Sequence, residues 1–515
     1  MAKRAKPENY YLQSGLLTKK SAKRENTEAG RLAAYIVDRI PAGFDIYEDH
    51  DTNEVHLADA IVATCGRYIR HCPQIGWMAY HAEDGRWSDR CAEPAVEEVV
   101  KHFGHRLLEG AMKTRPEEGA FARKMLSAAG IAAVKRILRN HVAIATDQGQ
   151  FDADPDLWNC KGEAYNHRTA ESRPAEPEDL FSMSAKFKAA PLRKDACGGW
   201  EMPGVPKEFD GFMRKATSKD GAERPDLSLF ILFFFGYCMT GDNGASFFVN
   251  FHGGGNNGKS QLLMLMLELF GDYGMALPKD VVIENRFGSQ FNLAGLPGKR
   301  LGVLIDAPEG RLNMDLLKSL TSGDAVSAQR KYLSDIKFNP VCKIAVGSNP
   351  KLKLNETGMS VRRRIRMVPF DYTVPDSELV ANIHLKLLEE GPEILSLLLF
   401  FAHEYYRNGE GPKAFPPCAV VDEASKEYMN SQDLVGRWKD ERTEAAPGKN
   451  TSVAELYDDF RKWADSEGVQ KKMSKNTFGE HLSVKIPKKR IGDTVHYLDI
   501  RLKGGNIALP GDGGG

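Results

Sequence analysis

In the first third of the chain, the spacing of apolar residues predicts helices and one hairpin. Apolar residues recur three and four positions apart over residues 96–112 and 121–140, which is typical of amphipathic helices. Around Asp84-Gly85, apolar and polar residues alternate, which predicts two strands joined by a turn. We therefore expect a mainly helical α+β domain over residues 31–190.

Beyond residue 205, short apolar runs alternate with helical periodicity. Strands are expected over residues 246–251, 300–306 and 343–349, and helices over residues 225–240, 259–270 and 312–321. Strands that alternate with helices favour a parallel sheet covered by helices on both faces. The expected fold class is multidomain α/β, and the α/β domain is expected to span residues 205–410.

The last part of the chain has a different pattern. Three prolines between residues 412 and 417 mark a linker, and the two short helices and strand that follow have the order of a winged helix-turn-helix over residues 420–503. Nine Lys or Arg residues oppose three acids in residues 468–503, a local excess of six. This excess favours duplex DNA binding, with residues 474–484 as the recognition helix. A solvated basic face that only aids subunit contacts is the alternative.

Composition excludes some classes of function. The 515 residues include 70 Lys and Arg and 70 Asp and Glu, and a net charge of zero excludes a protein that coats nucleic acid through bulk positive charge. The longest nearly apolar run, residues 229–239, is shorter than the roughly 20 residues that a membrane-spanning helix needs. Residues 1–30 and 504–515 are expected to be flexible tails without an export signal. We therefore expect a cytoplasmic protein with no membrane partner.

The strongest chemical signal is HGGGNNGKS at residues 252–260, which satisfies the phosphate-loop pattern GxxxxGK(S/T) between a predicted strand and a predicted helix. Backbone N–H groups can surround phosphate oxygens where side chains do not block them, Lys259 adds a positive charge, and the Ser260 hydroxyl can bind Mg²⁺. ATP and Mg²⁺ are the expected cofactors, although no motif here identifies the base; a glycine-rich turn without a ligand is the alternative. The residues expected to hold the nucleotide are Gly253, Gly254, Gly255, Asn256, Asn257, Gly258, Lys259, Ser260 and Gln261.

A catalytic metal also needs a carboxylate at the end of a neighbouring strand. The strand over residues 300–306 ends in Asp306, to which we assign Mg²⁺ binding and polarisation of the attacking water. Glu309 follows as a secondary group or alternative base. A cap or turn role stays open for Asp306, and a purely structural role stays open for Glu309.

Two further polar groups follow along the chain. Asn349 ends the third predicted strand, where it can orient the lytic water or sense the γ-phosphate, and a simple turn before Pro350 is the alternative. Arg362, Arg363 and Arg364 precede an apolar strand. Three adjacent arginines are common on a solvated surface, but Arg363 or Arg364 also suits an arginine finger that reaches the γ-phosphate of a neighbouring subunit.

Together, these stretches resemble the superfamily-3 helicases, specifically the phage/plasmid primase-helicase branch that includes poxvirus and satellite-phage replicative ATPases. The stretches that carry the resemblance are HGGGNNGKS, APEGRLNMDLLKSLTSGD, AQRKYLSDIKFNP, KIAVGSNP and RRRIRMVPF. The resemblance covers about residues 55–500 and is strongest over residues 247–370. That group often has Glu where this chain has Asp306, so the division of roles between Asp306 and Glu309 stays open.

The resemblance implies an AAA+-like core in a hexameric ring that hydrolyses ATP between subunits and moves 3′-to-5′ along single-stranded DNA. A hairpin before the third strand would then project into the channel, which makes Arg330, Lys331 and Lys337 candidate DNA contacts, unless they are ordinary surface cations. The implied function is a replicative helicase of a phage, plasmid or mobile element, in the cytoplasm of a bacterial host or virus-infected cell. Origin duplex DNA and other replication proteins are further candidate partners. The alternative is an origin-binding or loader ATPase without unwinding activity.

Primer synthesis is not expected from this sequence. Asp152, Asp154 and Asp156 form an acidic run, but they lie in a proline-containing loop. We interpret them as turn and capping residues. Too little chain precedes residue 55 to hold a polymerase domain.

Overall fold

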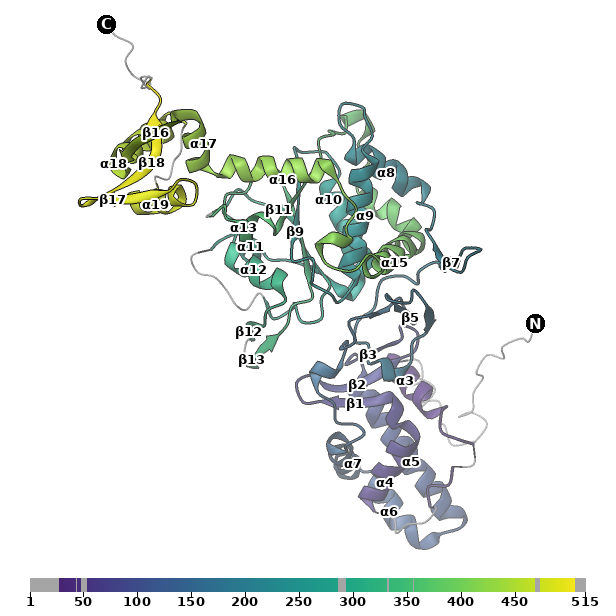
Figure 1. Ribbon diagram of the computed structural model, residues 1–515. Helices are drawn as coiled ribbons and strands as arrows, with labels where there is room; N and C mark the ends of the chain where they lie inside the picture. Colours follow the sequence, from purple (N-terminus) through teal and green to yellow (C-terminus); the bar gives the residue numbers. More distant parts are fainter. Residues whose placement is uncertain are drawn as a thin grey trace.

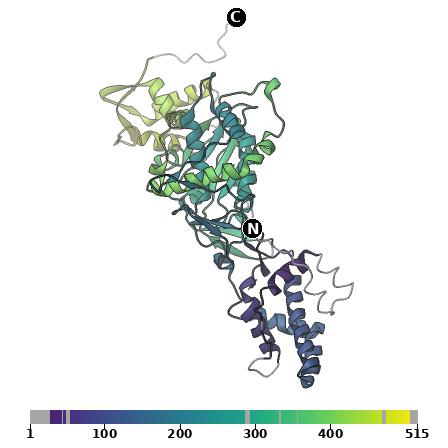
Figure 2. The same cartoon turned by 90° about the vertical axis from the view of Figure 1, so that its right-hand side faces the viewer.

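The computed structural model describes residues 27–42, 44–47, 53–285, 293–330, 333–354, 356–467 and 473–504. In Figure 1 the chain runs from an N-terminal part at the bottom, through a central α/β part, to a C-terminal part at the upper left. Figure 2 shows from the side that the N-terminal part extends away from the central part. The fold is multidomain α/β, as expected. Among the described residues, no helix combines the length and apolar character needed to cross a bilayer.

Helices dominate the N-terminal part. They are α3 (Glu28–Val37), α4 (Glu54–Cys65), α5 (Ala92–Lys113), α6 (Gly119–Met125) and α7 (Ala128–Asn140), and they enclose one apolar core. The helix expected over residues 121–140 is divided into α6 and α7. Ser127 caps α7 by accepting a hydrogen bond from the Gly130 backbone N–H, and a Cβ at Gly130 would lie 2.3 Å from the Lys124 carbonyl oxygen. The chain therefore turns sharply between the two helices.

The predicted hairpin is confirmed. Strands β1 (Ile69–Cys72), β2 (Gly76–His81) and β3 (Arg86–Ser88) form an antiparallel sheet in that order. Gly85 ends the β2–β3 turn with a φ of +63°, a conformation that favours glycine. Strands β4 (Leu157–Asn159), β5 (Glu163–Asn166), β6 (Ser172–Pro174), β7 (Arg193–Lys194) and β8 (Trp200–Glu201) lead to the central part.

In the acidic run before β4, Asp154 makes the predicted turn contact, whereas Asp152 and Asp156 bind residues further along the chain. The Asp152 carboxylate accepts a hydrogen bond from the Ser182 backbone N–H at 3.0 Å, and the Asp154 carboxylate accepts one from the Asp156 N–H at 2.9 Å. The Asp156 side chain pairs with Arg168, with 2.6 Å between Oδ2 and Nε. All three carboxylates therefore bind protein partners, those of Asp152 and Asp156 lying 30 and 12 residues away in the sequence.

Five parallel strands form the central sheet, in the order β10 (Gly274–Ala276), β11 (Leu301–Ala307), β14 (Lys343–Ser348), β9 (Phe248–His252) and β15 (Ile365–Pro369). The strands expected near residues 246–251, 300–306 and 343–349 are all present. The antiparallel hairpin of β12 (Val326–Arg330) and β13 (Leu333–Phe338) precedes β14 and projects away from the sheet in Figure 1.

The sheet separates two apolar cores, which confirms the prediction that both faces are covered. Val249 and Phe251 of β9 pack into one core, and Phe248 packs into the other. The first core includes α8 (Lys207–Thr217), α9 (Pro225–Met239), α10 (Lys259–Phe270) and α15 (Gly391–Arg407). The second core includes α11 (Lys279–Val282), α12 (Met314–Ser322) and α16 (Ala419–Gln432).

The strand order corrects one expectation. We expect β11, which carries Asp306, to lie beside β9, but β14 lies between them. Asp306 therefore approaches the end of β9 from two strands away. A β-bulge gives β11 one extra residue at this point, because Ile305 and Asp306 of β11 together lie opposite Gly347 of β14.

The prolines of residues 412–417 do not form an open linker. Phe415 packs among aromatic rings, with ring centroids 4.9 Å from Phe247 and 5.0 Å from Phe233. The α16 helix then packs on β15, and the Ser425 hydroxyl accepts a hydrogen bond from the Met367 backbone N–H at 2.9 Å. By its contacts, the segment as far as α16 is part of the central core.

The C-terminal part has its own apolar core, which includes Trp438, Phe460 and Phe478. Its elements are α17 (Leu434–Arg442), β16 (Thr443–Ser452), α18 (Val453–Ser466), α19 (Lys475–Ser483), β17 (Lys488–Ile491) and β18 (Thr494–Leu502). The two predicted helices and the predicted strand are present as α18, α19 and β18. The strands form a sheet in the order β16-β18-β17, so β17 is an edge strand.

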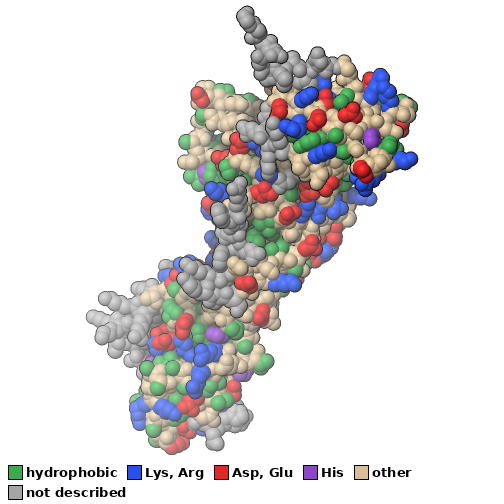
Figure 3. Space-filling model, turned by 90° about the vertical axis from the view of Figure 1, so that its left-hand side faces the viewer, with side chains coloured by type: hydrophobic (Ala, Val, Ile, Leu, Met, Phe, Trp, Pro, Cys, Tyr) green, Lys and Arg blue, Asp and Glu red, His purple; other side chains and the backbone are tan. Residues whose placement is uncertain are grey.

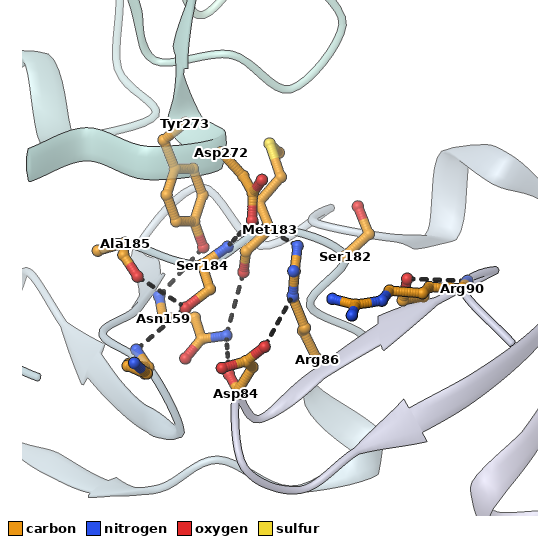
Figure 4. A network of polar contacts seen from close by, with 12 residues as sticks. Asp84, Arg86, Arg90, Asn159, Ser182, Met183, Ser184, Ala185, Asp272 and Tyr273 are labelled. Carbon is orange, nitrogen blue, oxygen red and sulfur yellow. Dashed lines mark hydrogen bonds and ion pairs between the residues drawn. The ribbon is translucent and has the colours of Figure 1, made fainter. Parts of the chain in front are cut away.

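A polar network joins the N-terminal part to the end of α10, as Figure 4 shows. Arg86 at the start of β3 pairs with Asp272, and the Asp272 carboxylate also accepts a hydrogen bond from the Ser184 backbone N–H at 3.1 Å. The adjacent Tyr273 ring stacks on Trp158 with 3.8 Å between ring centroids. A cleft of about 470 Å³ opens beside this network.

We predict that Gly347→Ala destabilises the central sheet. The new Cβ would lie 2.3 Å from the Ile305 carbonyl oxygen, a backbone atom that cannot move without breaking the bulge. The free energy of unfolding, measured by denaturant titration, should fall by about 1–3 kcal/mol.

Gly204→Ala is the matched control for this prediction. Gly204 lies in an exposed loop with no heavy atom near the position of its missing Cβ, so its substitution should leave the unfolding midpoint nearly unchanged. Equal midpoints for both variants would show that the bulge does not require glycine.

Candidate nucleotide-binding site

The glycine-rich loop joins the carboxyl end of β9 to the first residue of α10, where backbone N–H groups are available to an anion. Gly253 and Gly258 are required by the fold itself. A Cβ at Gly253 would lie 2.2 Å from the Phe370 carbonyl oxygen, and Gly258 has a φ of +85°. Gly254 and Gly255, in contrast, have open space where a Cβ would be.

The Lys259 ammonium lies at the centre of the site. Its Nζ donates to the carbonyl oxygens of Gly253 (3.1 Å) and Gly254 (3.0 Å), and to the side-chain oxygens of Asn257 (3.0 Å) and Asn349 (2.9 Å). Burial lowers the pKa of Lys259 below its ordinary value, and the negative charge of Asp306 acts in the opposite direction. The ammonium is therefore held at the loop before any ligand binds.

Asn257 holds the loop in place. Its Nδ2 donates to the Gly254 carbonyl oxygen at 2.7 Å and to the Phe370 carbonyl oxygen at 3.1 Å. The backbone carbonyl of Asn256 accepts a hydrogen bond from the Val374 N–H at 2.7 Å. These contacts fasten the loop to the segment that follows β15, so Asn257 has a structural task as well as its predicted place in the nucleotide site.

The two residues after Lys259, Ser260 and Gln261, have different surroundings. Ser260, the second residue of α10, is half-buried. Gln261 contacts α14 (Ile383–Leu387), where its Oε1 accepts a hydrogen bond from the His384 backbone N–H at 3.3 Å and lies 2.7 Å from His384 Nδ1. The Gln261 side chain therefore binds a neighbouring helix.

Of the candidate catalytic groups, the structure brings Asn349 and Asp306 towards Lys259. Asn349 follows β14 directly and accepts the Lys259 hydrogen bond, and exposed Asp306 at the end of β11 acts on the charge of Lys259. Glu309, in contrast, pairs with Lys353 at 2.8 Å, and this hydrogen bond lowers the pKa of the Glu309 carboxyl.

A buried polar pair lies in the adjacent strands, and sequence reasoning missed it. The Ser348 hydroxyl at the end of β14 donates to Asn250 Oδ1 in β9 at 2.9 Å, and both side chains are buried. Asn250 Nδ2 has no hydrogen-bond partner among the residues that the structure describes. The isolated Asn inside the apolar stretch SFFVNF was the available signal for it.

The three arginines differ in their surroundings. Arg362 ends the short helix α13 (Met359–Arg362) and Arg363 is exposed beyond it. Arg364 is only 8% exposed and donates to the Ser322 hydroxyl at 2.8 Å and to the Ser360 carbonyl oxygen at 2.9 Å. Burial, and then the charge of Arg363, lowers the pKa of Arg364. Of the two, Arg363 is therefore the one whose side chain is open to solvent.

Of the three candidate DNA contacts on the β12–β13 hairpin, the structure describes only some side chains. Lys337 is exposed on β13, opposite Ser327. Arg330 ends β12, but its side chain lies outside the described part of the structure, and Lys331 lies outside the described residues. The described residues contain no cluster of three or more His, Cys, Asp or Glu that could hold a metal ion alone.

Two family models match parts of the chain. The model described as D5 N terminal like matches residues 58–212, which include most of α4, all of α5, α6 and α7, and the residues of the N-terminal part that contact Asp272 and Tyr273. The model of a family of unknown function, DUF5906, matches residues 251–364, which include the glycine-rich loop, Asp306 and Asn349. Each match covers less than half of the chain.

Known proteins give two further similarities. A protein of Acanthamoeba polyphaga mimivirus named "Putative helicase" is 24% identical over 366 residues, which are 65% of this chain and 34% of that protein. The chain thus spans about a third of the length of its mimivirus relative. Among solved structures, two apo forms of the NrS-1 C-terminal region align with 87% and 85% of this chain, and with 100% and 88% of their own, at TM-scores of 0.46 and 0.44 and identities of 10% and 12%. The chain is similar to D5-like proteins in its N-terminal part and, over a longer stretch, to a viral protein named as a helicase.

Proposed function

We propose that this protein is an ATP-dependent DNA helicase that serves replication of a phage, plasmid or related mobile element. In this proposal a ring of identical subunits, as a hexamer of the superfamily-3 type, moves 3′-to-5′ along single-stranded DNA. The observation that carries it is the position of the Lys259 ammonium, held by loop oxygens and Asn349 where parallel strands end. The D5-like match and the name of the mimivirus relative support the same class.

The residues of the site fit ATP. Gly254 and Gly255 leave their backbone open to a close approach, and α10 begins at the loop with its N–H groups unpaired within the helix. Lys259 would bind the β- and γ-phosphates as a point charge. Bound ATP would supply the phosphoanhydride bond that is cleaved.

Mg²⁺ also fits the donors of the site. Magnesium is usually held by one or two carboxylates together with substrate phosphates and waters, so a cage of protein ligands is not required. Ser260 would contribute its hydroxyl and Asp306 its carboxylate. Asp306 would also polarise the attacking water, and Asn349 would orient that water or sense the γ-phosphate.

A ring would complete this site from a second subunit. Arg363 is exposed, whereas Arg364 is occupied by Ser322 and Ser360, so we assign the arginine finger to Arg363. Lys337, with Arg330 and Lys331, would line the channel on the projecting hairpin. A few cations repeated around a ring make a positive channel in a chain of zero net charge.

The other parts take supporting roles in the proposal. Residues 31–190 form a pre-helicase domain, residues 205–410 the AAA+-like core extended by α16, and residues 420–503 a winged helix that binds origin duplex DNA. Other replication proteins are further partners, and the chain works in the cytoplasm of a bacterial host or infected cell. We propose no primer synthesis, since Asp152, Asp154 and Asp156 are used in contacts with protein partners.

We predict that Lys259→Ala abolishes ATP hydrolysis. Loss of the ammonium removes the charge that would bind the β- and γ-phosphates, and the rate should fall by about 100-fold or more. The test is hydrolysis with and without single-stranded DNA, which should stimulate the natural chain. Lys413→Ala, at an exposed lysine far along the chain, is the control and should hydrolyse ATP normally.

Strand displacement on a 3′-tailed duplex separates a helicase from a loader. The natural chain should part the duplex with ATP, and the Lys259→Ala chain should not. Hydrolysis without any strand displacement would favour an origin-binding or loader ATPase.

We predict that Asp306→Asn and Glu309→Gln have unequal effects. Asp306→Asn should lower the hydrolysis rate by about 100-fold or more, because it removes the group that polarises water. Glu309→Gln removes an exposed ion pair with Lys353 and should change the rate by less than about fivefold. Single-turnover hydrolysis at saturating ATP measures both, and the reverse order would give the base role to Glu309.

We predict that Arg363→Ala lowers hydrolysis by about a thousandfold or more without destabilising the chain. Arg364→Ala, in contrast, should lower the unfolding midpoint, since it removes a buried side chain with two partners. Mixing Arg363→Ala with Lys259→Ala subunits should restore part of the activity, because some interfaces then have both groups intact. No recovery on mixing would contradict the assignment of a finger in trans.

A further inference from the structure

The basic excess of the C-terminal part is concentrated on one strand. Of its nine cations, Lys471 and Lys472 lie outside the described residues. Lys485 pairs with Asp433, Arg501 pairs with Glu444, and Lys503 Nζ donates to the Asp440 carbonyl oxygen at 2.7 Å. The remaining four are Lys475 on α19 and Lys488, Lys489 and Arg490 on β17.

The α19 helix is a poor candidate for reading DNA. Its cation Lys475 is balanced within the same helix by Glu480. Phe478 and Leu482 face the apolar core. The helix expected from the sequence to recognise DNA, residues 474–484, therefore carries one exposed Lys or Arg side chain, that of Lys475.

The β17 strand, in contrast, carries three exposed cations in a row. All four of its residues are exposed, and β17 is one of the two edge strands of its sheet, at the outer side of the C-terminal part in Figure 1. The space-filling view shows several Lys and Arg side chains on this end of the molecule, interspersed with Asp and Glu (Figure 3). The acid that lies nearest in sequence, Asp493, is 4.0 Å from Arg490 with both groups highly exposed, a geometry that contributes little attraction.

The register places these cations on both faces of the sheet, near the free end of the β17–β18 hairpin. At His496 and Tyr497, β18 pairs with β16 as well as with β17, so the hairpin is two-stranded only from Arg490 to Val495. Lys489 lies opposite His496 of β18, so both project to one face of the hairpin. Lys488 and Arg490 alternate with Lys489 and project to the other face, beside Tyr497 and Val495. On this second face Tyr497 is buried in the core of the C-terminal part, whereas Lys488 and Arg490 are exposed.

A two-stranded β-ribbon fits the major groove of duplex DNA, where a phosphate backbone lies on each side. We infer that the two-stranded end of the β17–β18 hairpin enters this groove and that Lys488, Lys489 and Arg490 contact the phosphate backbones. Binding is then largely independent of sequence, because phosphate contacts carry no base information. This inference rests on the proposed function, because that function is the reason for the chain to bind duplex DNA.

The test compares two triple variants of the full chain with equal charge change. In the hairpin variant, Lys488→Gln, Lys489→Gln and Arg490→Gln are combined. In the control variant, Arg461→Gln, Lys462→Gln and Lys475→Gln remove three cations from α18 and α19 of the same C-terminal part; all six side chains are exposed. Fluorescence anisotropy measures binding to a labelled duplex of mixed sequence over a series of salt concentrations, without nucleotide.

The hairpin variant should lose affinity by about tenfold or more near 0.1 M salt, and the slope of log K against log salt should become shallower by about 2 to 3. The control variant should keep the slope of the natural chain. Equal losses in both variants, an unchanged slope in the hairpin variant, or no duplex binding by the natural chain would each overturn the inference. Because no ATP is present, a chain that binds duplex through the hairpin but never unwinds it would refute the motor and leave this inference standing.

Discussion

The candidate site depends on one constraint, which is that parallel strands end at the same edge of a sheet. Here the backbone of β11 also contacts β14 at Gly347. The Ile305 carbonyl of β11 lies where a side chain at position 347 of β14 would begin. Only glycine allows this approach, and the resulting bulge extends β11 by one residue at Asp306. The carboxylate, Asn349 and the Lys259 ammonium come from three different segments and share one end of the sheet because of this geometry.

The local elements of the core could be predicted from the sequence. The apolar run of α9, the helix that begins at Lys259 and the glycines of residues 253–258 all depend on neighbours within a few positions. The order of the strands could not, because pairing joins residues that are distant along the chain. Nothing in the sequence near Asp306 indicates that β14 lies between its strand and β9. The short strand β10, three residues long, also gives too weak a pattern to detect.

The charged candidates show a second limit of sequence reasoning. Spacing along the chain indicates which residue types are available, but it does not show which of them are already used by a partner. Glu309 is paired with Lys353, and Arg364 is held by Ser322, whereas Asn349 reaches Lys259. Each of these contacts spans more than 40 residues of sequence. The linker predicted from the prolines of residues 412–417 shows the same limit. The aromatic ring of Phe415 packs against a core formed by helices that are distant in the sequence.

The α10 helix joins two places that are otherwise far apart in the fold. Lys259 lies at one end of α10. Beyond the other end, Asp272 forms an ion pair with Arg86 and the Tyr273 ring stacks on Trp158. Its 12 residues form a stiff rod of about 18 Å, at 1.5 Å per residue. A tilt of α10 about its glycine-rich end would displace its opposite end, which Asp272 and Tyr273 follow. If the site binds ATP as proposed, a tilt of α10 would reach the N-terminal part through the ion pair of Asp272 with Arg86, without any contact between that part and the phosphates.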